Sequence, residues 1–326
     1  MAKKINGNLE ARLLDARLRM KSGLSDGALF ETTNRVRALQ NSLEDLGEKQ
    51  ALELYRHFPV AAISVLETHF RSYIASIVDF NPMYLERGLI LSSDALKSSA
   101  ELLSILHRKT ITIGELIAYS MPFNSMASLE KVFDTLFNDD FKKLMSSALD
   151  PYFVRNKVGN GSPVIDDIKS LWRDLSVAFE QRHILAHEAA SNFIVSYKDA
   201  KSALDSIVAF TNAFDAVKWA TVWKDLPLTQ YEMNNHAWDN YKKSRIIFSK
   251  ELKRCLNLAT KNGMRQRFRK QHAEWKIYSN NLIAWECENF TMGSIGPLIE
   301  AMARMRAIDS QLESISAIFP EEFKIS

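Results

Sequence analysis

Apolar residues recur at helical spacing along almost the whole chain, and this periodicity limits the possible folds more than any other feature. Between Val60 and Phe80 one face of a helix carries Ile63, Leu66, Phe70, Ile74 and Ile77. No segment shows the sustained alternation of β-branched residues that is typical of strands. The 326 residues include only 11 Gly and 8 Pro, which leaves few turns. The sequence therefore predicts an all-α protein built from long helices.

The ends of the predicted helices are marked by local signals. Pro59 opens the apolar helix and Asn81-Pro82 ends it, while Thr112 with Glu115 and Ser125 with Ser128 form capping boxes. The clearest loop is 157–163. The other predicted helices lie at 9–57 with a break near Gly23 and Gly27, at about 92–107, 112–120, 125–137 and 139–148, at 164–180 and at about 188–222.

Composition and charge are those of a soluble globular protein. Hydrophobic residues make up 46% of the chain and charged residues 25%, and no apolar run approaches the roughly 20 residues that span a bilayer. The start, Met1–Asn8, turns polar at once and has no apolar core of a signal peptide. Two cysteines, Cys255 and Cys287, are too few for a disulfide framework. We therefore expect a cytoplasmic protein without membrane contact.

The stretch 179–188 contains the candidate catalytic residues. It reads Phe-Glu-Gln-Arg-His-Ile-Leu-Ala-His-Glu, with Arg182, His183 and His187 inside an otherwise apolar helical pattern. Histidine moves protons near neutral pH, and arginine binds phosphoryl oxygens through its planar guanidinium group. The same histidines are four apart and could bind a metal ion, but no third ligand stands at HExxH spacing, so we expect no metal and no cofactor. Either histidine could instead be a buried core residue.

The spacing within this stretch has a geometric consequence. On one ideal helix Arg182 and His187 point about 140° apart, so a single uninterrupted helix cannot direct both at one phosphate. We therefore expect the stretch to lie at a helix start, or to act across a homodimer interface. Apolar residues of the helix that follows, expected to be left for that contact, are Phe193, Val195, Ile207, Phe210 and Phe214.

Residues 51–225 resemble a HEPN domain. The resemblance rests on the Arg-x4-His motif, on the apolar helix with its internal Glu67, and on the segments 111–117 and 123–125 between them. It implies a helical bundle, with residues 1–50 belonging to it or packed on it. Many HEPN domains are metal-independent ribonucleases, which implies catalytic roles for Arg182, His183 and His187. Glu67 is either a salt-bridged core carboxylate or a supporting residue of the site.

Residues 226–326, beyond the boundary near Asp225-Leu226-Pro227, resemble the small helical LprI-like lysozyme-inhibitor domain. The opening Thr-Gln-Tyr-Glu-Met-Asn at 229–234, Trp275, the segment 285–288 around Cys287 and the Gly-Ser loop 293–298 carry this resemblance. Secreted members of that family pair their cysteines. Here His236 stands where a cysteine often follows the opening, and Met302 or Ala303 stands near the expected partner of Cys287.

The C-terminal segment also carries the basic surplus. Between residues 226 and 290 there are twelve Lys and Arg and six Asp and Glu, a local charge of +6 against +3 for the whole chain. Arg265, Arg267, Arg269 and Lys270 are closest together, and we expect them to bind the phosphates of RNA. The alternative is that they form a solvated helix face.

Together these features predict a metal-independent endoribonuclease of toxin or phage-defence type. His187 is expected to be the general acid/base, Arg182 the phosphate clamp and His183 an orienting group, and the products would be a 2′,3′-cyclic phosphate and a 5′-OH. Expected partners are RNA, a second copy or higher homo-oligomer, and an antitoxin or regulatory protein. The competing hypothesis is a non-catalytic helical adaptor, in which the first domain dimerises and the second binds a protein. A lysozyme inhibitor would require export.

Overall fold

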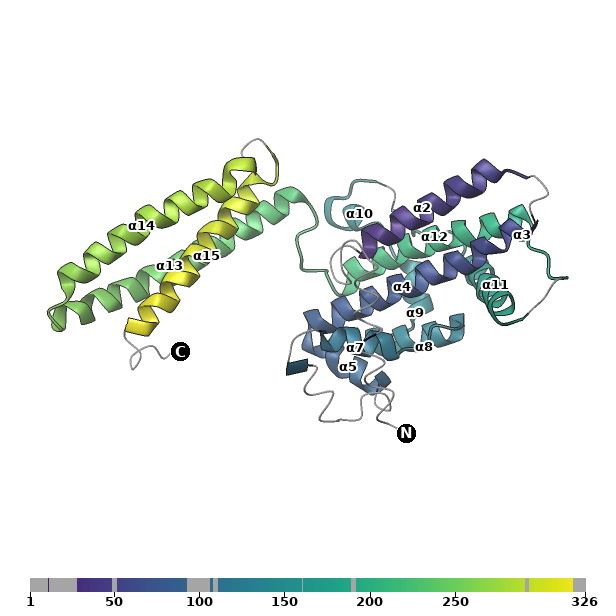
Figure 1. The fold of residues 1–326 in the computed structure, drawn as a ribbon, viewed down its shortest axis with the longest axis horizontal. Coiled ribbons are helices and arrows are strands. Elements are labelled where there is room, and N and C mark those ends of the chain that lie inside the picture. Colours follow the sequence, from purple (N-terminus) through teal and green to yellow (C-terminus); the bar gives the residue numbers. More distant parts are fainter. Residues whose placement is uncertain are drawn as a thin grey trace. The chain divides into compact units, whose positions relative to one another are not determined.

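The computed structural model describes residues 11, 28–48, 52–92, 106–107, 111–159, 161–188, 192–290 and 293–318. Within these ranges the regular structure is helical, and the one pairing of extended backbone is an isolated bridge between Leu149 and Pro163. The prediction of an all-α protein is confirmed. Contacts divide the chain into two compact units, with the boundary in the sequence between Lys224 and Asp225 (Figure 1).

The first unit is built around α4 (His57–Phe80), on which α2 (Ala28–Leu46), α7 (Ile113–Ser120), α11 (Ile168–His187) and α12 (Tyr197–Thr221) all pack (Figure 1). This central position follows from its sequence, because apolar residues cover more than one side of α4. Those with no exposed surface are Ala62, Ile63, Leu66, Phe70, Ile74 and Ile77. The helix begins two residues before Pro59, whose missing N–H costs no hydrogen bond in a first turn.

Shorter helices complete this unit: α3 (Leu52–Tyr55), α5 (Pro82–Ser92), α8 (Met126–Phe137), α9 (Phe141–Ser147) and α10 (Pro151–Asn156). The two capping boxes are confirmed, at the starts of α7 and α8. The sequence did not predict α5 and α10. Each starts with a proline after a residue whose side chain accepts backbone N–H groups, Asn81 and Asp150. The helices expected over 9–27, apart from Ala11, and over 93–105 lie outside the described residues.

The predicted boundaries around the Arg-x4-His stretch are wrong. Asp167 caps α11 by accepting from the N–H groups of Lys169 and Ser170, both at 3.0 Å. The helix then continues through the motif to His187, and α12 begins only at Tyr197, behind a capping box formed by Ser196 and Asp199. The motif therefore occupies the end of a helix and not the start of one.

Most of the apolar residues predicted for a dimer surface belong to the core. Val195, Ile207, Phe210 and Phe214 have no exposed surface, and Phe193 is partly buried against the same core. Phe210 and Phe214 lie in an aromatic cluster with Phe133 and Phe141, with ring centroids of neighbours 4.8–6.1 Å apart. These side chains stabilise the monomer and cannot also contact a second copy.

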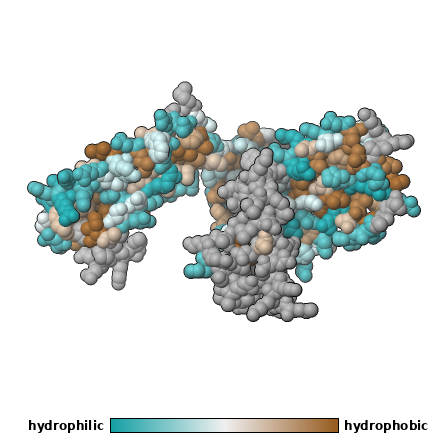
Figure 2. All heavy atoms as spheres, viewed as in Figure 1, coloured by the Kyte–Doolittle hydropathy of each residue, from teal (hydrophilic) through white to brown (hydrophobic). Residues whose placement is uncertain are grey.

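The second unit consists of α13 (Gln230–Lys261), α14 (Arg265–Cys287), the short 3₁₀ turn Glu288–Phe290 and α15 (Gly296–Ile318). α15 packs against both α13 and α14. Its main core is small, consisting of Phe248, Cys255, Ala259, Phe268, Ile308 and Ile315. On the visible face of this unit, hydrophobic residues lie exposed among hydrophilic ones (Figure 2). None of the helices described is long and apolar enough to cross a membrane.

Candidate active site

Glu67 of α4 joins Arg182 to the core of the first unit. Its Oε1 lies 3.5 Å from Nη2 of Arg182 on α11, and its Oε2 lies 3.5 Å from Nη1 of Arg71, one turn further along α4. The Glu67 side chain is 15% exposed and that of Arg182 is 28% exposed. Ion pairs in such partly buried positions are screened less by salt than surface pairs. Glu67 therefore holds the guanidinium of Arg182 at the edge of the bundle.

Arg71 is held on its other side by aromatic rings. Its guanidinium carbon lies 5.3 Å from the ring centroid of Tyr119 and 5.7 Å from that of Phe123. Its buried Nε has no hydrogen-bond partner among the described residues. Two guanidinium groups thus share one carboxylate, and the cluster of Glu67, Arg71 and Arg182 carries a net positive charge that suits an anion.

His183 and His187 lie one turn apart on the exposed side of α11. Their ring centroids are 5.1 Å apart and the rings are inclined by 55°. Both residues are exposed, and the described residues offer neither ring a hydrogen-bond partner. Neither is therefore a core histidine. The ring nitrogens are available to a substrate or to another chain.

The helix separates these two groups. Because α11 runs without interruption through the motif, Arg182 and His187 project about 140° apart and are displaced by about 7 Å along the axis. His183 projects between them, about 40° from His187. One copy of the chain therefore presents a clamped arginine on one side of α11 and a histidine pair on the other.

Sequence reasoning named Glu67 but missed Arg71, and the structure places both in one cluster. The spacing of Glu67 and Arg71 on a single helix is a recognised pairing pattern and could have indicated the contact. The contact between Glu67 and Arg182 carries no such signal, since it joins helices far apart in the chain.

A second polar cluster lies inside the same unit. His69 is 7% exposed, and burial, followed by the nearby charge of Lys218, lowers its pKa to about 3. Lys218 is 2% exposed, forms an ion pair with Asp215, and its Nζ lies 3.9 Å from the ring centroid of Trp223. His69 and Asp215 line a cavity of about 470 Å³ together with Asp150, Thr211 and Asn212.

The four basic residues expected to bind RNA lie in the first two turns of α14. All four are exposed, but they do not share a face. Arg265 and Arg269 point within about 40° of each other, while Arg267 and Lys270 point about 140–160° away from Arg265. Lys270 also lies 3.9 Å from Glu274. Among the described residues, no three His, Cys, Asp or Glu side chains are grouped so that they could hold a metal ion.

Comparison with protein-family models, with curated proteins and with solved structures found no match to this chain.

Proposed function

We propose that this protein is a metal-independent endoribonuclease whose site is formed by Arg182, His183 and His187. The proposal rests on one observation, that α11 carries both an arginine held in place by a carboxylate and two exposed imidazole rings. Glu67 fixes the guanidinium of Arg182 at the edge of the bundle, and the exposed rings of His183 and His187 lie in contact with each other on the other side of the same helix. The resemblance to HEPN domains in residues 51–225 supports the same function, and with it a HEPN-like fold for the first unit.

The chemistry requires a proton acceptor, a proton donor and a cation. The RNA 2′-oxygen attacks the adjacent phosphorus and forms the 2′-O–P bond, while the bond from phosphorus to the 5′-oxygen breaks. His187 takes the 2′-OH proton, and the leaving 5′-oxygen takes a proton from the resulting imidazolium or from water. Arg182 binds the phosphoryl oxygens as negative charge develops on them. Glu67 is a positioning residue, and His183 orients the substrate or the second imidazole.

A second copy of the chain completes the proposed site. Arg182 and His187 diverge on one α11, so two copies facing each other would bring the arginine of one toward the histidines of the other. Because the apolar residues of α12 are buried, the contact has to come from elsewhere. Val177 on α11 and Ile194 in the loop after it are 44% and 62% exposed, and we assign the contact to them.

Cleavage of mixed cellular RNA in EDTA tests the proposal. We expect cuts that leave 2′,3′-cyclic phosphate and 5′-OH ends, and a loss of about 10²-fold or more in Arg182→Ala and His187→Ala. Arg173→Ala and His57→Ala are matched controls, since each removes the same type of side chain from an exposed position of the first unit. The controls should cut like the unaltered protein.

Two outcomes would refute the enzyme. One is full activity in folded His187→Ala, and the other is the absence of any cut by the unaltered protein over a range of RNA and pH. The second outcome would favour the adaptor hypothesis. That hypothesis has its own support, because the second unit, for which we propose an LprI-like fold, exposes large apolar side chains such as Ile277, Tyr278 and Trp285.

A further inference from the structure

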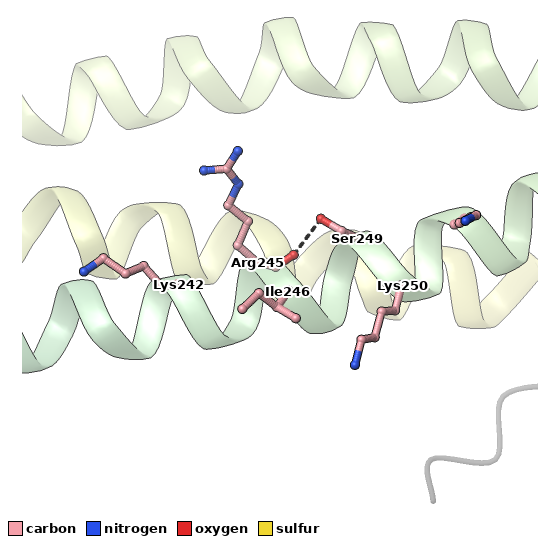
Figure 3. Close-up of a pocket in the computed structure, with 6 residues that line it drawn as sticks. Lys242, Arg245, Ile246, Ser249 and Lys250 are labelled. Carbon is pink, nitrogen blue, oxygen red and sulfur yellow. Dashed lines mark hydrogen bonds between the residues drawn. The ribbon is translucent and has the colours of Figure 1, made fainter.

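Basic side chains lie along three turns of α13, together with Ile246 and Ser249. Lys242, Arg245, Ile246, Ser249, Lys250 and Lys253, here called the α13 stripe, line an open groove of about 620 Å³. Figure 3 shows Arg245 and Ser249 on one side of the α13 ribbon and Ile246 and Lys250 on the other. The Ser249 hydroxyl donates to the carbonyl oxygen of Arg245 at 2.8 Å.

Most of the cations of the α13 stripe have no acidic partner. Two nearby acidic residues of α13 already form ion pairs. Asp239 pairs with Lys242 at 2.9 Å, and Glu251 pairs with Arg254 at 3.0 Å. For Arg245, Lys250 and Lys253, the described part of the chain supplies no carboxylate within ion-pair distance, and all three are exposed. A polyanion could neutralise these three cations without displacing an existing pair.

The spacing of the α13 stripe fits an extended strand. Lys242 and Lys253 are eleven residues apart, which is close to three turns, so they point within about 20° of each other and about 16 Å apart along the axis. Tyr231 lies another eleven residues before Lys242, near the same line, and is 74% exposed. Ile246, 58% exposed, lies between the two lysines. Cations along a backbone with aromatic and apolar groups beside them are typical of sites for single-stranded nucleic acid.

We propose that the α13 stripe binds the phosphate backbone of single-stranded RNA, with Tyr231 and Ile246 in contact with bases or sugars. The inference rests on the proposed function, because it makes RNA the ligand. It moves the contact from Arg265, Arg267, Arg269 and Lys270 on α14 to α13, where the cations are accompanied by the exposed Tyr231 and Ile246. Duplex RNA offers no unstacked bases for Tyr231 and Ile246 to contact, because its bases are paired and stacked within the helix.

The test uses the full chain carrying His187→Ala, so that binding is measured without cleavage. A fluorescent 12-nucleotide oligouridylate is titrated at several salt concentrations. Arg245→Gln, Lys250→Gln and Lys253→Gln together should weaken binding about tenfold or more. The slope of log affinity against log salt should fall by about 2, because each single-strand phosphate contact contributes about 0.7. Tyr231→Ala should weaken binding by about tenfold with the slope unchanged.

The matched control replaces Arg265, Arg267 and Arg269 together by Gln, which removes the same charge from the same unit. Its slope should stay within about 0.7 of the parent. Equal losses in both triple variants, or no loss in the α13 triple variant, would overturn the proposal. So would tighter binding to duplex DNA or to phosphatidylserine vesicles than to the oligouridylate. If His187→Ala cuts RNA like the unaltered protein, only the proposed catalytic site is refuted. The proposed RNA contact is tested separately, because binding is measured in a variant that lacks His187.

Discussion

Among single residues, the buried His69 has the most direct consequence for stability. It lies edge-on to Phe70 and Phe214, with ring centroids 6.1 Å and 6.0 Å away, and its pKa is lowered to about 3. In the unfolded chain the pKa is that of an ordinary histidine, about 6.5. Between these two values the unfolded state binds more protons than the folded state. The free energy of unfolding therefore falls as the pH falls from 6.5 toward 3.

We expect His69→Gln to remove this dependence. From pH 7 to pH 5 the unaltered protein should lose about 2 kcal/mol of stability through His69 alone, at about 1.4 kcal/mol per pH unit. Urea unfolding at the two pH values, followed by far-UV circular dichroism, measures the difference between the two proteins. Exposed His57→Gln is the matched control on the same helix and should behave like the unaltered protein. Parallel pH dependences in His69→Gln and the unaltered protein would show that the imidazole titrates normally when folded.

At the scale of helices, the local sequence predicted where a helix begins better than where it ends. Thr112 and Ser125 each stand three residues before the side chain that completes a capping box. The start of each helix can therefore be read from the local sequence. The end of α11 lacks such a signal. No glycine or proline stands near His187, and Glu188 ends the helix in an extended conformation. Pairing between helices is harder still, as the contact of Glu67 with Arg182 shows, because it depends on how α4 and α11 pack.

Gly114 is a case in which helix packing requires a particular residue. Its N–H donates to Oδ1 of Asp79 at 2.9 Å, which holds α7 against α4. A Cβ at this position would overlap the carbonyl oxygen of Ala75 and lie 2.8 Å from the Asp79 carboxyl group. Since one of these neighbours is backbone, the clash cannot be relieved by turning a side chain.

We therefore expect Gly114→Ala to destabilise the protein by about 1–3 kcal/mol, the usual cost of overpacking. The effect should appear as a lower midpoint of urea unfolding with an unchanged slope. Gly293→Ala is the control, since a Cβ there meets no atom closer than 3.9 Å. Equal stability of the Gly114→Ala and Gly293→Ala variants would mean that α7 can move away from α4 at little cost.

For the whole molecule, the decisive property is the number of copies that form one site. The sequence predicted that Arg182 and His187 diverge, and the uninterrupted α11 keeps them apart in one copy. The sequence could not predict which surface a second copy would use, because buried and exposed apolar residues follow the same helical period. Phe210 and Phe214 were expected at that surface but lie in the core.

Mixing two inactive variants decides whether the site is shared. If Arg182 of one copy acts with His187 of the other, a dimer of Arg182→Ala with His187→Ala keeps one intact site of two. Half of randomly assorted dimers are of this mixed kind, so co-expressed variants should recover about a quarter of full cleavage. Mixing either variant with the double variant Arg182→Ala/His187→Ala should recover nothing, which controls for cellular ribonuclease. Cleavage by the mixture at the level of the two variants measured separately would place both residues in one copy. In that case Arg182 would have to leave Glu67 and swing around α11 to meet the histidines. Glu67→Gln would then raise the rate, whereas loss of a positioning residue lowers it.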